Sequence, residues 1–440
     1  MLSSRSLVLV GVAVVLAACS DAPQPPVARR PIQSVPPGSG TPTPTFSPQD
    51  TPPEFLVLGS RAGVTVLDPA TGLLRFSGTG ASSLGDWSKL FTANPSGGWT
   101  VIREYEATTG ETLSTIRLRG KLAIRVVSAH GGKVALMAPE PPGRSTRIPQ
   151  LRDFTDIVVA DPTDPREPRR FHLRGNFEPE AFSTDGTSLF LIRYLPPTAP
   201  ASYQVARLDL AEGKVLPVLG RRKTPVETMS GTRLEQLASP EGTRLYTLYT
   251  SQPPAYAKGH DAVQARAGRP VAFIHTLSLD GGWAVCIGLP KVFWGGDPAV
   301  EALTLSRDGR RLYVVDTARG VVAVIDTVEL TVLRTAKVPI ERARRPSGKA
   351  TGATVLPDGN ALFVAGGRRV VVVDSATLRL KWIWDMFGPT SRMAFSSNGR
   401  VLYALLRDEV EVLNASSGQR IRMIPIPGTE GIEFMGTLTG

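Results

Sequence analysis

The sequence predicts an all-β fold, a single β-propeller of four-stranded antiparallel blades. Three observations lead to this prediction: a short motif recurs along the chain, the inner strands are apolar on both faces, and the C-terminus can supply a strand that the N-terminal unit lacks. The 440 residues, of which 42% are hydrophobic, can bury a large core. The repeats favour one ring of blades over several separate domains.

The recurring motif is a pair of short strands joined by a tight turn. It reads LSRDGRRLYVVD from residue 305, and its variants are FSTDGTSLFLIR from 182, ASPEGTRLYTLY from 238, VLPDGNALFVAG from 355 and FSSNGRVLYALL from 395. A glycine follows Asp, Glu or Asn in each, and glycine readily adopts the positive φ of such turns. The turn glycines are Gly85, Gly131, Gly186, Gly242, Gly309, Gly359 and Gly399. Their spacing of 40 to 67 residues suits propeller blades.

Residues 301–338 show how one unit forms a blade. We expect strands at 302–306, 312–315, 321–326 and 331–338. The second and third are continuously apolar, which requires that both faces of the sheet be buried. The fourth carries Arg334 and Lys337, which are typical of an exposed edge strand. This pattern indicates a blade packed between two neighbours.

The two ends of the folded region complement each other. Residues 54–78 supply three strands but no first strand, and EGIEFMGTL at 430–438 can provide it. A C-terminal strand that joins the N-terminal blade would close the ring and remove its open edge. This count gives eight blades; seven is the alternative if residues 79–119 are irregular.

The stretch RLYVVDTARGVVAVIDTVELTVLRTAKV, residues 311–338, resembles the YVTN-repeat propellers, which are relatives of the WD-repeat and lactonase-like propellers of exported bacterial proteins. The resemblance extends over residues 54–440 and is sharpest at 300–425. It implies the fold but no single function, because this architecture hosts binding modules, lactonases, lyases and dehydrogenases. The Trp384-Asp385 pair is out of phase with the WD-repeat signature.

The N-terminus indicates export. Residues 1–18 have the basic start and apolar run of a signal peptide. Leu16 to Cys19 resemble the lipobox of bacterial lipoproteins, in which the cysteine is acylated; an ordinary secretory signal is the alternative. Acylated Cys19 would anchor the protein on the extracytoplasmic side of a membrane, at the cell surface or in the periplasm. Residues 19–53 are rich in Pro, Ser and Thr and predict a disordered tether, followed by the propeller at 54–440.

Long insertions are expected on one face of the ring. Connections between the second and third strands of a blade, and between blades, share this face, and insertions begin there near residues 139, 195, 250, 289 and 340. Long loops of this kind are usually functional; accumulation by drift is the alternative. The candidate binding residues are Tyr256, Lys258, His260, Asp261, Phe293, Trp294, Asp297, Arg342, Arg344 and Arg345, and Arg221, Arg222 and Lys223 would add positive charge. Phe293 and Trp294 could instead cover the side of a blade.

Evidence for catalysis is sparse. The four histidines are scattered without ligand spacing, so no metal, cofactor or catalytic residue is predicted. Glu180, Glu235 and Glu301 should line the central channel, where a hard cation is conceivable. Cys286, in the apolar run WAVCIGL, is expected to be buried.

The sequence therefore favours a lipid-anchored, monomeric binding or scaffold module for a protein or cell-envelope polymer. A lactonase- or lyase-like enzyme with a site at the channel mouth is the alternative. The formal net charge of +11 is a weak indication of an acidic partner. Nucleic acid is excluded as the expected partner because its recognition motifs are absent from the sequence.

Overall fold

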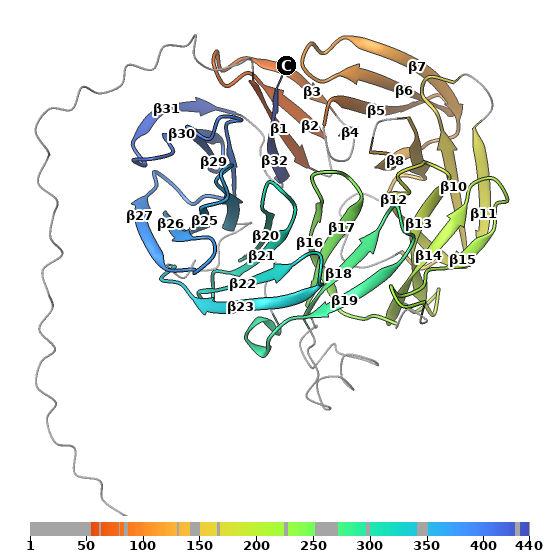
Figure 1. Ribbon diagram of the computed structural model, residues 1–440. Helices are drawn as coiled ribbons and strands as arrows, with labels where there is room; N and C mark the ends of the chain where they lie inside the picture. The colour runs from red at the N-terminus through yellow and green to blue at the C-terminus, as the bar shows by residue number, and fades with distance from the viewer. Residues whose placement is uncertain are drawn as a thin grey trace, which may run out of the picture. The chain divides into compact units, whose positions relative to one another are not determined.

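The computed structural model describes residues 54–60, 63–78, 80–82, 87–129, 132–140, 150–164, 168–223, 228–250, 272–295, 300–340, 351–426 and 432–439. Their strands form eight four-stranded antiparallel sheets in a ring (Figure 1). The prediction of an eight-bladed β-propeller is confirmed. The seven-blade alternative is wrong, because β4 to β7 make a complete sheet of their own.

We number the blades from the N-terminus and name the innermost strand of each blade first. Blade 1 contains β32 (Ile432–Thr439), β1 (Glu54–Ser60), β2 (Val64–Leu67) and β3 (Leu74–Gly78), and blade 2 contains β4 (Gly80–Ser82), β5 (Lys89–Ser96), β6 (Trp99–Glu106) and β7 (Thr112–Arg119). Blade 3 contains β8 (Ala123–Val127), β9 (Val134–Met137), β10 (Phe154–Ala160) and β11 (Arg169–Arg174), and blade 4 contains β12 (Asn176–Phe182), β13 (Ser188–Leu195), β14 (Ser202–Asp209) and β15 (Val215–Pro217).

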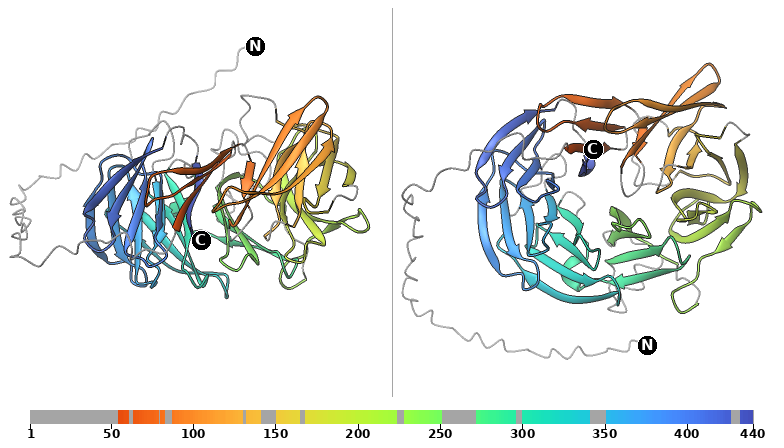
Figure 2. Two further views of the ribbon diagram at one scale, coloured as in Figure 1. Left: turned by 90° about the horizontal axis from the view of Figure 1, so that it is seen from above. Right: turned by 45° about the horizontal axis from the view of Figure 1, so that its top comes forward.

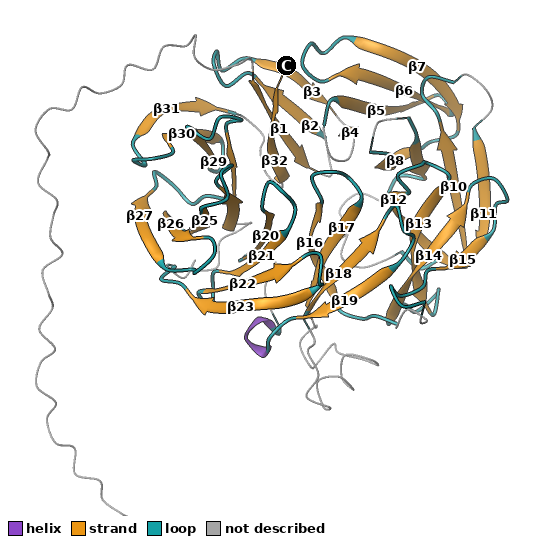
Figure 3. Cartoon of the chain, in the orientation of Figure 1, coloured by secondary structure: helices purple, strands orange, loops and turns teal. Residues whose placement is uncertain are grey.

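The second half of the ring repeats the pattern. Blade 5 contains β16 (Thr232–Ala238), β17 (Arg244–Thr250), β18 (Phe273–Ser278) and β19 (Ala284–Gly288), and blade 6 contains β20 (Glu301–Leu305), β21 (Arg311–Asp316), β22 (Val321–Asp326) and β23 (Thr331–Lys337). Blade 7 contains β24 (Thr351–Val355), β25 (Ala361–Gly366), β26 (Arg369–Asp374) and β27 (Leu380–Asp385), and blade 8 contains β28 (Arg392–Phe395), β29 (Val401–Leu405), β30 (Glu409–Asn414) and β31 (Arg420–Pro425). A short 3-10 helix, η2 (Lys291–Phe293), precedes blade 6 (Figure 3).

The C-terminal strand closes the ring, as predicted. β32 pairs with β1 along its length, from Glu54 opposite Thr439 to Ser60 opposite Ile432. The Thr437 hydroxyl also donates to the carbonyl of Phe395 in blade 8 at 3.0 Å. The C-terminus therefore lies inside the ring (Figure 2), and blade 1 is made from both ends of the folded chain.

The recurring motif forms the turn between the first two strands of a blade. In blade 6, the Ser306 hydroxyl donates to the Asp308 carboxylate at 2.6 Å and accepts from the Arg311 amide at 3.0 Å. Gly309 has a φ of +66° and donates to the Ser306 carbonyl at 2.8 Å. The Ser306 and Arg310 hydrogen bonds lower the pKa of Asp308. The turn thus satisfies its own polar groups, which explains why the same residues recur.

The hydrophobic core lies between blades. One cluster combines Tyr313, Val315 and Val324 of blade 6 with Leu362 and Val371 of blade 7, all at most 1% exposed. Both faces of β21 and β22 are buried, whereas most side chains of β23 are exposed and the others are half-buried. Each sheet is therefore packed between two others, as the apolar inner strands predicted. Among the described residues, no helix has the length and apolar character needed to cross a bilayer.

A second type of turn joins the third and fourth strands and ends in a left-handed residue. Leu330 and Leu378 hold this position in blades 6 and 7, with φ of 58° and 59°. Glycine holds it in blade 8, where Gly418 has a φ of +71° and a Cβ would lie 2.5 Å from the Trp384 ring. Space, rather than backbone conformation alone, therefore requires glycine at position 418.

Gly418→Ala is expected to destabilise the protein by about 3 kcal/mol, because backbone strain of about 1 to 2 kcal/mol is joined by a steric clash with Trp384. Gly213→Ala is the matched control: Gly213 has a φ of +72°, but its Cβ would make only ordinary contact with Phe171 at 3.7 Å. Denaturant unfolding of both variants measures the difference. Equal losses would show that the Trp384 contact is unimportant.

Candidate binding face

The predicted insertions all start from the same face of the ring. Because successive strands alternate in direction, the turns between strands one and two and between strands three and four lie on one side, which we call the turn face. The other connections lie on the opposite side, the insertion face. The strands that flank residues 138–153, 196–201, 251–272, 289–300 and 338–350 end and resume at the insertion face, and each of these connections starts from one of blades 3 to 6.

The link between β15 and β16 departs from the expected arrangement. Leu219 forms a parallel bridge with Trp283, and Arg221 donates to the Val328 carbonyl at 3.0 Å. Trp283 and Val328 both lie in turns between third and fourth strands. Arg221 therefore lies at the turn face, and the expectation that it adds charge to the insertion face is wrong. The sequence could not show that this link runs along the outer edge of the next blade before returning.

Only two of the candidate binding residues lie within the described part of the chain. Phe293 is 1% exposed and belongs to the apolar cluster shared by blades 5 and 6. Trp294 is half-buried against the same cluster, and its indole donates to the Leu289 carbonyl at 3.3 Å. Arg319 holds this segment by donating to the Trp294 carbonyl at 2.8 Å. Phe293 is thus a core residue, which matches the alternative interpretation of this pair.

The other candidates lie outside the described residues: Tyr256, Lys258, His260, Asp261, Asp297, Arg342, Arg344 and Arg345, with Cys19 and the predicted tether.

A cluster of charged side chains lies at the insertion face of blades 3 and 4. Arg125 donates to Glu140 at 3.1 Å, and its Nε lies 3.4 Å from Glu178. Arg152 donates to the other oxygen of Glu178 at 3.1 Å. Burial raises the pKa of Glu178, although both arginines favour its charged form. We call Arg125, Glu140, Arg152 and Glu178 the charged cluster; sequence patterns missed it because its members come from four separate segments.

Aromatic rings lie beside the charged cluster. Tyr194 is 6.4 Å from Tyr203, which stacks at 5.1 Å on Tyr249, and Tyr249 stacks at 5.3 Å on Phe273. Burial, followed by the nearby charge of Glu178, raises the pKa of Tyr194 to about 12, so its hydroxyl stays protonated. Tyr249 lies near the end of β17 and Phe273 begins β18, so both are close to the insertion 251–272. Tyr203, Tyr249 and Phe273 are at most 9% exposed and belong to the core between blades 4 and 5, so these strands are held by a buried aromatic platform.

The acidic residues predicted to line the channel do lie on the innermost strands, and two of them are engaged by arginine. Glu180 accepts from Arg233 at 2.9 Å and from Gln236 at 2.5 Å, which joins blades 4 and 5. Glu235 forms an ion pair with Arg392 of blade 8 and accepts from the Leu303 amide at 3.1 Å. Both carboxylates therefore stabilise contacts between blades. Within the described residues, no group of three or more His, Cys, Asp or Glu side chains could hold a metal ion.

Cys286 is exposed, so the expectation that it is buried is wrong. It lies on β19, the outermost strand of blade 5, which lacks a neighbouring strand on one edge. An apolar run therefore does not guarantee burial at the rim of a blade.

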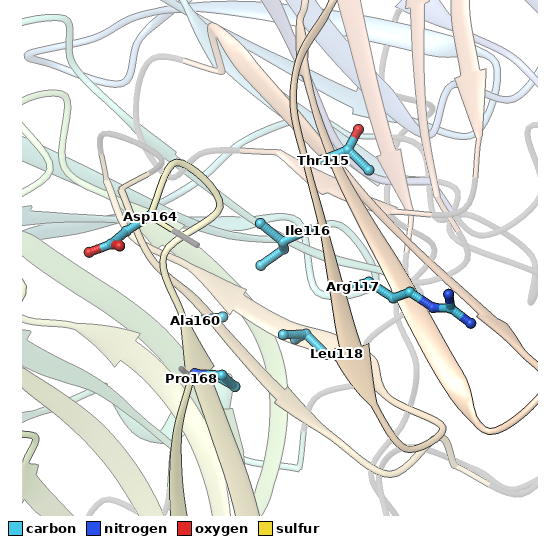
Figure 4. Close-up of a pocket in the computed structure, with 7 residues that line it drawn as sticks. All are labelled: Thr115, Ile116, Arg117, Leu118, Ala160, Asp164 and Pro168. Carbon is cyan, nitrogen blue, oxygen red and sulfur yellow. The ribbon is translucent and has the colours of Figure 1, made fainter. Parts of the chain in front are cut away.

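A small pocket lies between blades 2 and 3 (Figure 4). Its volume is about 220 Å³, and it is lined by Thr115, Ile116, Arg117, Leu118, Ala160, Asp164 and Pro168. This volume is below the roughly 300 to 1,000 Å³ of typical small-molecule sites.

His275 is expected to make the stability of the propeller depend on pH. It is fully buried, and burial lowers its pKa to about 4. The unfolded chain binds the proton below about pH 6.5, while the folded chain stays neutral, so stability falls as pH drops from 6.5 towards 4. Between pH 7 and pH 5 we expect His275 to lower the unfolding free energy by about 2 kcal/mol. His275→Phe should remove this loss in denaturant titrations; an unchanged pH dependence would contradict the assignment.

The fold defines the class of protein: an eight-bladed β-propeller, with a charged cluster at its insertion face. The chain matches no protein-family model and no curated protein.

Among solved structures it is similar to apo AztD from Citrobacter koseri, with a TM-score of 0.52 and 12% identity over 88% of this chain and 97% of that chain. It is also similar to the dihydro-heme d1 dehydrogenase NirN in complex with DHE, with a TM-score of 0.48 and 17% identity over 89% of this chain and 76% of that one. A candidate 6-phosphogluconolactonase from Bacteroides fragilis has a TM-score of 0.44 and 12% identity, over 89% of this chain and 99% of that one. At these identities the likeness to AztD shows the fold alone.

Proposed function

We propose that this protein is a lipid-anchored, extracytoplasmic β-propeller that binds a protein or cell-envelope polymer through its insertion face. The observation that carries the proposal is that the predicted insertions start from strand ends at the insertion face of blades 3 to 6, the face that also holds the charged cluster. Arginine, which supplies two members of the charged cluster, is enriched where proteins bind partners because it offers a large contact area and directional hydrogen bonds.

The position of Glu54 indicates on which face of the ring the proposed lipid anchor would attach. Glu54 is the first residue of β1, and its carboxylate accepts from the amide and hydroxyl of Ser397 at 3.0 and 3.1 Å. Ser397 lies in the turn between β28 and β29, on the turn face. A lipid anchor on Cys19 would therefore connect to the side opposite the insertions. This arrangement leaves the insertion face available to a partner.

A pair of matched charge reversals tests the binding proposal. Arg193 is exposed near the end of β13 at the insertion face, and Arg310 is exposed in a turn on the opposite face. We expect Arg193→Glu, and replacement of residues 251–270 by a short Gly-Ser linker, to reduce crosslinking to neighbours in intact cells by about tenfold while the melting temperature is kept. Arg310→Glu should change neither. Loss of crosslinking in Arg310→Glu alone would contradict the proposal.

The anchor has a separate test. Cys19→Ala should yield a protein that is neither acylated nor recovered with membranes, measured by mass spectrometry and fractionation. A Cys19→Ala product that remains acylated and membrane-bound would overturn this part of the proposal.

One observation favours the enzymatic alternative, a lactonase- or lyase-like activity. Glu178 combines a raised pKa with two neighbouring arginines and Tyr194, a combination that suits general acid or base chemistry. Glu178→Gln would abolish such an activity while Arg193→Glu left it unchanged. Hydrolysis of a lactone panel by the purified protein measures it.

A further inference from the structure

Exposed apolar side chains gather at the rim of blades 7 and 8. On β27, Leu380 is 49%, Trp382 54% and Ile383 44% exposed, and Phe387 follows at 58%. The Phe387 ring packs against the Arg420 guanidinium of β31 at 5.4 Å, so the apolar surface continues into blade 8. There Ile421 is 43% exposed. We call Leu380, Trp382, Ile383, Phe387 and Ile421 the apolar rim.

Basic side chains surround the apolar rim. Arg379 and Arg420 are both exposed, and no described acidic side chain forms an ion pair with either of them. Lys381 pairs with Asp374 at 3.3 Å, and Arg369 pairs with the exposed Asp385 at 3.0 Å. The outermost strands of blades 6, 7 and 8 together carry five basic residues, Arg334, Lys337, Lys381, Arg420 and Arg422, and one acidic residue, Asp385. The rim is therefore both apolar and cationic.

The backbone of the rim argues against a partner that adds a strand. The pairing of β26 with β27 shifts register between Val372 and Val373, and the pairing of β30 with β31 shifts between Val412 and Leu413. Such bulges twist an edge and protect it from further strand pairing. The side chains, rather than the backbone, are thus the groups that the rim offers to a partner.

We infer that the apolar rim is a membrane-contact surface that docks the propeller edge-on against an anionic phospholipid bilayer. Trp and Phe beside aliphatic side chains favour the membrane interface, and Arg and Lys attract anionic headgroups. Blade 1, where the described chain begins, adjoins blade 8 through Arg422, which donates to the Ala70 carbonyl at 2.9 Å. The inference rests on the proposed lipid anchor in one respect: an anchor leading to blade 1 would tether the propeller to the membrane that the rim contacts.

Vesicle binding tests the inference without the acyl chains. The full mature chain with Cys19→Ser is mixed with vesicles of phosphatidylcholine alone or of phosphatidylcholine with phosphatidylglycerol, and sedimentation measures the bound fraction. We expect binding to the anionic vesicles only. Trp382→Ser with Ile383→Ser, and separately Arg379→Glu with Arg420→Glu, should each weaken it about tenfold.

Two controls make the result specific. Leu113 is 48% exposed on the outermost strand of blade 2, so Leu113→Ser removes a comparable side chain elsewhere on the ring and should leave vesicle binding unchanged. Arg310→Glu is the corresponding control for charge. Absence of vesicle binding, or binding that the rim variants do not weaken, would overturn the inference, as would a dimer in sedimentation velocity that Trp382→Ser dissolves. None of these outcomes affects partner crosslinking at the insertion face, so the proposed function is judged separately.

Discussion

Deletion of residues 432–439 is expected to prevent the propeller from closing. These residues are the innermost strand of blade 1, and without them β1 loses its partner and the apolar side chains Leu56 and Leu58, now fully buried, reach solvent. The lost backbone pairing and burial amount to roughly 5 to 10 kcal/mol. This is comparable to the whole stability of an ordinary domain. We expect a chain that aggregates or melts at least about 15 °C below the intact protein, measured by calorimetry.

A point variant of the same strand separates closure from the general effect of truncation. A Cβ on Gly436 would lie 1.5 Å from the Trp87 ring, so Gly436→Ala forces the strand or the ring to move. A Cβ on Gly388 would meet Leu406 at an ordinary 3.6 Å, which makes Gly388→Ala the control.

A synthetic peptide of residues 430–440 should partly restore the melting temperature of the truncated chain. If the truncated chain melts like the intact protein, closure by β32 contributes little.

Arg392→Met is expected to destabilise the propeller by about 3 to 5 kcal/mol, because it leaves the Glu235 carboxylate buried without its cation. The two side chains are 11% and 10% exposed, and they join blade 8 to blade 5. Glu235→Gln in the same chain should recover much of the loss. Chemical unfolding of the two single variants and the double variant gives the coupling free energy.

An exposed ion pair provides the comparison. Arg369 and Asp385 are 47% and 83% exposed, and such pairs contribute less than about 1 kcal/mol. Arg369→Met should therefore have little effect on unfolding. If Arg392→Met and Arg369→Met lowered the unfolding free energy by the same small amount, the Glu235–Arg392 pair would not have the stabilising role expected here.

The fold was predictable because residues within each repeat determine the strands and turns of that repeat. The turn that contains Ser306 forms its hydrogen bonds within a few residues. The continuously apolar strands β21 and β22 indicate that both faces of the sheet are buried. Ring closure was also predictable, since residues 54–78 lack a strand that the C-terminus contains. These signals depend on neighbouring residues or on composition, so they are visible in the sequence itself.

The site was less predictable because its contacts join distant segments. Glu235 and Arg392 are 157 positions apart, and nothing in either stretch indicates that blades 5 and 8 approach each other. The same holds for the charged cluster, which depends on how blade 3 meets blade 4. Local apolarity misled at Cys286, which is exposed on the outermost strand of blade 5. The position of Arg221 was missed for another reason, because its contact with the Val328 carbonyl depends on the path of the link between β15 and β16.

Disulfide trapping across the two ends tests the closed ring most directly. Phe55 lies opposite Leu438 in the pairing of β1 with β32, and opposed residues of antiparallel strands are close enough for a disulfide. In a chain with Cys19→Ser and Cys286→Ser, we expect Phe55→Cys with Leu438→Cys to form an intramolecular disulfide under mild oxidation, seen as a gel shift and by mass spectrometry. Phe55→Cys with Thr331→Cys of blade 6 should not crosslink. A folded protein in which the first pair stays reduced would contradict the closed eight-bladed ring.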